Sequence, residues 1–121
     1  MKNLEDRIEA LEKTVQQLET QIGRLRSIAD TRKHPFTYLM LEYNITREQE
    51  EEIFKLMEHI RKEIFENKAP MNHANFEQMV YEIVPNRKGD YHFAENIVMC
   101  LNDTNQYPDV YLHMKKSGMN I

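Results

Sequence analysis

Three histidine–glutamate pairs have residue types and spacing that could support metal binding or acid–base chemistry. In each pair the histidine comes three or four positions before the glutamate, which places both side chains on one face of a helix: His59 and Glu63, His73 and Glu77, and His92 and Glu95. A helix start predicted at Asn75 interrupts the second pair. A catalytic zinc site needs at least three converging protein ligands, and the sequence supplies only separate pairs. We therefore predict no metal site and no cofactor.

The single cysteine, Cys100, is the one candidate nucleophile. It lies in the apolar run 97–101, whereas a reactive cysteine needs a nearby base and an electropositive setting. The sequence also lacks a serine elbow, a glycine-rich phosphate loop and a paired-carboxylate motif. We expect a small buried thiol and no catalytic residue, and an enzyme is the third of our hypotheses. One cysteine allows no disulfide within the chain, which suits a reducing cytosol.

A basic cluster at the end of the first thirty residues and just beyond them could dock a partner. It contains Arg24, Arg26, Arg32 and Lys33, with His34 beside them. Positive charge near a helix C-terminus is favourable for the helix dipole alone, and that is the simpler explanation. The alternative is a docking surface for an acidic protein or for nucleic acid. Against it, the carboxylates at 48–52 could neutralise the basic cluster.

The helix that ends in this cluster carries a heptad pattern. Leucines recur every seven residues at the d positions, which are Leu4, Leu11, Leu18 and Leu25. Mostly β-branched residues recur at the a positions, which are Ile8, Val15, Ile22 and Ala29. One helix cannot bury such a stripe alone, and an identical chain is the simplest partner. This pattern favours a parallel dimer, in which Arg7 of one chain faces Glu12 of the other. A trimer or tetramer, an antiparallel pair, and packing onto the chain's own body are the alternatives.

The remaining residues read as short helices. Only three glycines and four prolines punctuate 121 residues, and no alternating apolar pattern indicates a strand. We predict helices at residues 35–43, 46–67, 75–84, 90–101 and 108–116. Thr46 and Gln49 form a capping box, Asn75 and Asp90 are N-caps, and Gly118 is a C′ residue.

Apolar residues at helical spacing predict which side chains face the interior. Phe65 on the third helix and Met79 on the fourth are expected to face inward. Met71 and Met119 lie in a loop and in the tail, where a flexible apolar side chain could contact a partner.

Charge is unevenly distributed along the chain. The net charge is −4, and residues 35–84 carry five Lys/Arg against ten Asp/Glu. This acidic body counts against DNA binding, because phosphate contacts dominate the affinity of duplex-binding proteins. The N-terminus has no secretory h-region and the longest apolar run is far too short to span a bilayer, so we expect a soluble, cytoplasmic protein.

Together these patterns predict an all-α protein with a long N-terminal coiled-coil helix followed by a compact bundle of about five short helices. Residues 1–30 form the oligomerisation helix, 31–34 the basic junction and 35–121 a small helical domain. The interface residues are Leu4, Ile8, Leu11, Val15, Leu18, Ile22 and Leu25.

Several short segments resemble the YhaI-like proteins, a small helical family of unknown function from Gram-positive bacteria. They are Asp6-Arg7-Ile8-Glu9, Leu11-Glu12, Pro35-Phe36, Leu39, Ile45-Thr46-Arg47-Glu48 and Phe76-Glu77. The resemblance covers most of the chain in element order and implies a helical, oligomeric, cytoplasmic protein. It implies no active site.

The sequence thus favours a non-enzymatic interaction or regulatory module that self-associates and contacts another protein. The second hypothesis is a dimeric DNA-binding transcriptional regulator with a helix-turn-helix-like body, since a dimer suits a palindromic site. Its candidate reading helix, residues 90–101, carries no Arg or Lys, which leaves it poorly equipped for contacts with bases or phosphates.

Overall fold

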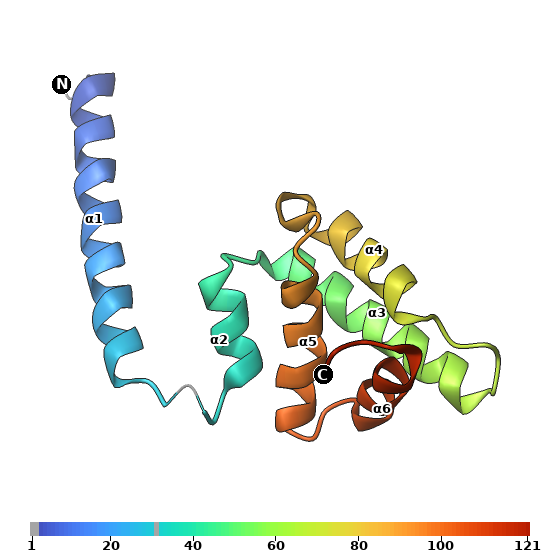
Figure 1. Ribbon diagram of the computed structural model, residues 1–121. Coiled ribbons are helices and arrows are strands. Elements are labelled where there is room, and N and C mark those ends of the chain that lie inside the picture. The colour runs from blue at the N-terminus through green and yellow to red at the C-terminus, as the bar shows by residue number, and fades with distance from the viewer. Residues whose placement is uncertain (1–2, 31) are drawn as a thin grey trace. The chain divides into compact units, whose positions relative to one another are not determined.

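The computed structural model describes residues 3–30 and 32–121 (Figure 1). These residues form six α-helices and one short 3-10 helix, with no strand among them, so the predicted all-α fold class is confirmed. The chain divides into two compact units, Met1–Asp30 and Thr31–Ile121. The second unit is called the body.

The first unit is a single helix, α1 (Leu4–Ile28). Its N-cap is Asn3, whose side-chain oxygen accepts a hydrogen bond from the backbone N–H of Asp6 at 2.8 Å. Glu5 and Asp6 in the first turn and Arg26 in the last complement the helix dipole. The predicted long N-terminal helix is confirmed, while its pairing in a coiled coil stays a prediction.

The body contains the other elements. They are α2 (Pro35–Glu42), α3 (Arg47–Phe65), α4 (His73–Ile83), the 3-10 helix η1 (Pro85–Arg87), α5 (Tyr91–Asp103) and α6 (Pro108–Ser117). The predicted capping box of α3 is confirmed. The Thr46 hydroxyl accepts from the Gln49 N–H at 3.1 Å, and the Gln49 side chain accepts from the Thr46 N–H at 2.9 Å. Asp90 caps α5 as predicted, by accepting from the Phe93 N–H.

The predicted start of α4 is wrong by one turn. Asn72, and not Asn75, is the N-cap, and its side chain accepts from the backbone N–H of Asn75 at 2.8 Å. The helix therefore begins at His73. The apolar periodicity begins only at Phe76, so the sequence pattern did not reveal the first turn.

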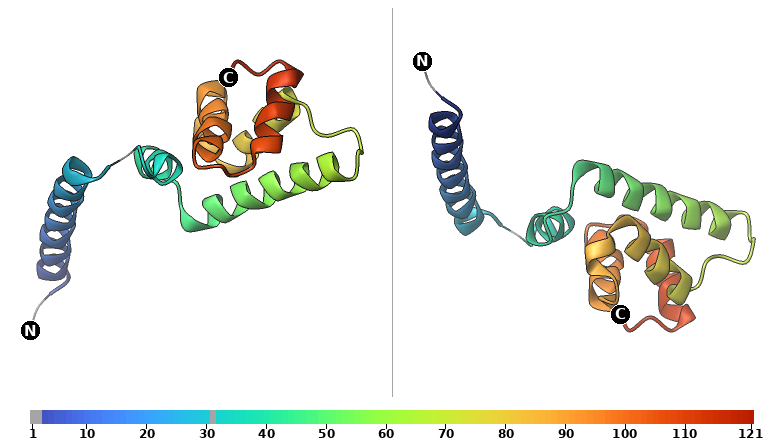
Figure 2. Two further views of the ribbon diagram at one scale, coloured as in Figure 1. Left: turned by 90° about the horizontal axis from the view of Figure 1, so that it is seen from below. Right: turned by 90° about the horizontal axis from the view of Figure 1, so that it is seen from above.

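Helix packing in the body is centred on α5, which contacts α2, α4 and α6, while α3 contacts α4 and α6. In both views of Figure 2, α3 runs along one side, and α4, α5 and α6 lie on the same face of it. Each of these four helices contributes fully buried side chains. They are Ile53, Met57 and Ile60 from α3, Phe76 and Val80 from α4, Phe93, Ile97 and Leu101 from α5, and Val110 and Met114 from α6.

Two side chains predicted to face inward are instead exposed. Phe65 is 89% exposed because it lies about 140° around the helix from the buried Ile60, at 100° per residue. Met79 is 37% exposed and lies at the edge of the face that Phe76 and Val80 bury.

Met119 was predicted to be available to a partner, but the structure buries it. Gly118 ends α6 in the left-handed conformation, and the Met119 N–H then donates to the Met114 carbonyl at 3.0 Å. This is the Schellman geometry, which returns the residue after the glycine to the helix. Met119 is only 4% exposed, so it belongs to the core and is not available to a partner.

Candidate functional site

The predicted interface residues form an uncovered apolar stripe along α1. No residue of this helix is buried. The exposed fraction of the seven predicted side chains ranges from 46% at Ile22 to 70% at Leu4. The stripe is therefore an apolar surface that its own unit cannot bury.

The stripe is indented along part of its length. A depression of about 460 Å³ is lined by Ile8, Leu11, Glu12, Val15, Gln16 and Glu19. In a coiled coil each apolar side chain inserts between four residues of the facing helix, and this depression, bordered by three stripe residues, offers space for such a side chain. A second depression, of about 420 Å³, is lined by Gln21, Arg24, Leu25, Ser27 and Ile28, of which only Leu25 belongs to the stripe.

Polar side chains of α1 point away from the stripe or lie at its edges. Lys13 pairs with Glu9 at 3.6 Å on the outer face, as expected of an i,i+4 pair. Among the residues that the structure describes, neither Arg7 nor Glu12 takes part in an ion pair within the helix. Both charges at the stripe's edge are thus available to a second helix.

The residues of the predicted basic patch are divided between the two units. Arg24 and Arg26 belong to α1, where the Arg24 guanidinium donates to the Gln21 side chain at 2.9 Å. Arg32 and Lys33 belong to the body and are exposed. That these four cations act together as one docking patch therefore stays a prediction.

The three histidine–glutamate pairs lie on three different helices of the body, α3, α4 and α5. His92 contacts Glu95 at 3.1 Å and His59 contacts Glu63 at 3.7 Å. For Glu77, burial raises the pKa of the carboxyl, and the charge of His73 opposes that shift. Within the described parts of the chain, no group of three or more His, Cys, Asp or Glu side chains could hold a metal ion.

His73 instead joins two helix ends. Its backbone N–H donates to the Ser117 hydroxyl at 2.8 Å, and its ring Nδ1 lies 3.0 Å from the same oxygen. This links the first turn of α4 to the last turn of α6. The sequence carries no signal for the contact, because the two residues are 44 positions apart.

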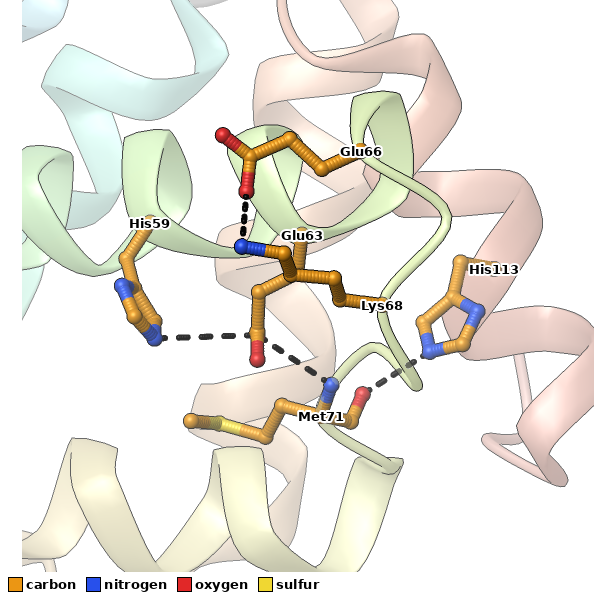
Figure 3. Close-up of polar contacts among 6 residues, drawn as sticks. All are labelled: His59, Glu63, Glu66, Lys68, Met71 and His113. Carbon is orange, nitrogen blue, oxygen red and sulfur yellow. Dashed lines mark hydrogen bonds and ion pairs between the residues drawn. The ribbon is translucent and has the colours of Figure 1, made fainter.

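A second polar cluster holds the connection between α3 and α4 (Figure 3). The Met71 N–H donates to the Glu63 carboxylate at 3.3 Å, and His113 Nε2 lies 2.8 Å from the Met71 carbonyl. In the same view, Lys68 pairs with Glu66 at 3.1 Å. Both backbone groups of Met71 are thereby satisfied. The arrangement anchors the loop between α3 and α4.

Cys100 is half-buried and lines an open groove of about 720 Å³ between α2 and α5. The groove is bordered by Arg32, Pro35, Tyr38, Leu39, Glu42, Tyr43, Asn96, Cys100 and Asp103. Burial, and then the charge of Asp103, raises the pKa of the Cys100 thiol. Since the thiolate is the nucleophile, this environment makes the side chain less reactive than an exposed cysteine.

Comparison with known proteins places the chain in one family. Residues 5–116 match the family of proteins of unknown function DUF1878. This chain belongs to that family. The match covers α1 and nearly all of the body, so both units are family features. The narrower YhaI-like assignment stays a prediction. No curated protein and no solved structure gave a match.

None of the helices in the described residues is long and apolar enough to cross a membrane.

Proposed function

We propose that this member of the DUF1878 family is a non-enzymatic, cytoplasmic interaction or regulatory module that self-associates through α1. The observation that carries the proposal is the stripe of seven apolar side chains, of which Ile22, the least exposed, is still 46% exposed. Water contact at so many large apolar groups is unfavourable, and burial against a second stripe removes it.

A parallel dimer is the assembly that the side chains support best. Ile8, Val15 and Ile22 at the a positions with leucine at d favour two parallel strands. In that orientation Arg7 of one chain faces Glu12 of the other. An antiparallel pair would instead place glutamates at e positions opposite one another, which is unfavourable.

The body or the basic junction then presents a second surface to another protein. A DNA-binding role is less well supported by the packing of α5, the candidate reading helix. Six of its thirteen residues are buried, and the helix has neighbours in α2, α4 and α6. A recognition helix must instead offer an exposed face to the major groove.

The test is the solution mass of the Leu11→Asp/Leu18→Asp variant, measured by light scattering over a concentration series. We expect twice 14.6 kDa for the natural chain and the monomer mass for the variant, because each substitution places a charge inside the stripe. The matched control is Ala10→Asp/Gln17→Asp, which adds the same charges one position earlier, on the outer face. This control should remain dimeric.

Other outcomes would contradict the proposal. A variant that keeps the dimer mass would exclude the stripe as the interface, and a natural chain that is monomeric would exclude self-association. Three or four times the monomer mass would exclude the dimer. Salt-dependent binding to random-sequence duplex DNA would favour the transcriptional regulator instead.

A further inference from the structure

A second candidate interaction surface lies in the body, where α3 and α4 run beside each other. It is a groove of about 370 Å³ lined by Glu48, Gln49, Glu52, Met79, Glu82 and Ile83. It lies far along the chain from α1 and shares no residue with the apolar stripe. The self-association proposed above does not use it.

The floor of this α3–α4 groove is apolar. Met79 is 37% exposed and Ile83 is half-buried. Methionine adapts its shape to different partners, which suits a binding surface. An exposed methionine beside a half-buried isoleucine therefore offers a site for one large apolar side chain.

Gln49 holds one end of the groove in place. Its side-chain oxygen accepts from the Thr46 N–H at 2.9 Å, and its amide nitrogen donates to the Ile83 carbonyl at 3.3 Å. One side chain thus connects the N-cap of α3 to the last turn of α4. These bonds hold α3 and α4 together at that end of the groove.

The rim of the groove is negatively charged. Glu48 and Glu52 lie one turn apart on α3, and Glu82 is opposite them on α4. Lys55 pairs with Glu52 at 3.1 Å. Among the residues that the structure describes, neither Glu48 nor Glu82 forms an ion pair. Two carboxylates therefore remain uncompensated beside the apolar floor.

We infer that the α3–α4 groove docks a basic amphipathic segment of another protein, with an apolar side chain on Met79 and Ile83 and lysine or arginine side chains at Glu48 and Glu82. Complementary charge steers such a partner to the groove, and like charge disfavours the phosphates of nucleic acid or anionic lipid. An apolar anchor with cations three or four residues away is the spacing of one helix face.

This inference deepens the proposed function, because it specifies the chemistry of the partner protein. The two can fail separately, since the groove and the stripe are altered by different substitutions.

The experiment measures binding of a fluorescently labelled amphipathic helical peptide built only of leucine and lysine to the full chain, by anisotropy. We expect Glu48→Gln/Glu82→Gln to weaken binding about fivefold, since an exposed ion pair contributes modestly. Met79→Gln should weaken it about threefold through loss of apolar contact. The matched control, Asp6→Asn/Glu9→Gln, removes the same charge from the outer face of α1 and should leave the affinity unchanged.

Two further peptides separate the apolar from the charged contribution. A peptide of lysine and glycine lacks the anchor, and a peptide of leucine and glutamate has the wrong charge; both should bind more weakly than the leucine–lysine peptide.

Equal losses for the groove variant and the α1 control would reduce the effect to the chain's overall charge and overturn the inference. Unchanged affinity in Glu48→Gln/Glu82→Gln would overturn it as well. If that variant lowers the solution mass of the chain without peptide, a second copy occupies the groove, and the inferred partner is wrong.

Discussion

Glycine-to-alanine substitution at the end of α6 is expected to destabilise the body strongly. Gly118 has φ +112°, a conformation that residues with a Cβ adopt only under strain. A Cβ added there would lie 3.2 Å from Cε1 of His73, so the ring would have to move. That ring lies 3.0 Å from the Ser117 hydroxyl and helps to link α6 to α4.

The magnitude is the sum of these two effects. Backbone strain of this kind costs about 1–3 kcal/mol, and a weakened hydrogen bond adds about 1 kcal/mol. Gly118→Ala should therefore lower the free energy of unfolding by about 2–4 kcal/mol. Equilibrium urea denaturation followed by far-UV circular dichroism measures this change.

Gly89 and Gly23 serve as comparisons for Gly118, because an added Cβ meets nothing within 4 Å at either position. Gly89 has φ +87° with nothing within 4 Å of an added Cβ, so Gly89→Ala should show the strain alone, about 1–3 kcal/mol. Gly23 lies inside α1, also in open space, and Gly23→Ala should stabilise the helix by about 0.5–1 kcal/mol. If Gly118→Ala is no more harmful than Gly89→Ala, the contact with His73 contributes nothing and the reasoning is refuted.

Two further predictions concern contacts that join distant segments of the body. Met119→Ala should lower the free energy of unfolding by about 2–4 kcal/mol, because it removes a core side chain that is 4% exposed; a loss below about 0.5 kcal/mol in urea denaturation would show that the tail does not pack on the core. Tyr107 donates to the Glu58 carboxylate at 2.7 Å, and burial together with this bond raises its pKa from 10.0 to about 12. Because the pKa of Tyr107 is higher in the folded state than in the unfolded state, the protonated side chain stabilises the fold. This contribution to the free energy of unfolding is complete below pH 10 and is lost as the pH rises to about 12. The stability difference between the natural chain and Tyr107→Phe should accordingly shrink over that range, whereas a constant difference would contradict the assigned pKa.

Local signals in the sequence were sufficient for most of the secondary structure. Capping depends on side chains within three positions of one another, so Thr46 with Gln49 and Asp90 with Phe93 were recognisable from spacing alone. At the start of α4 the same local rule led to the wrong cap, because the prediction chose Asn75 and the structure has Asn72 as the N-cap. The first turn of α4 carries no apolar pattern that would have revealed the earlier start.

The burial of particular side chains needed the tertiary structure. Phe65 and Met119 are both apolar, yet one is 89% exposed and the other 4% exposed. A glycine at C′ followed by an apolar residue is a Schellman signal, and that signal in Gly118-Met119 could have placed Met119 in the core. For Phe65 the separation of about 140° from Ile60 follows from helical spacing, but whether a neighbouring helix covers that side of α3 does not.

The sequence by itself determined the apolar stripe of α1, because a heptad pattern is a property of one helix and requires only residue spacing. It also determined the all-α fold class and the acidic balance of the body. Only the tertiary structure decided which distant residues share a surface. The α3–α4 groove combines residues 48–52 with residues 79–83, and the link between His73 and Ser117 joins two helix ends. Such surfaces arise from the way helices cross and pack, which the periodicity of each helix does not specify.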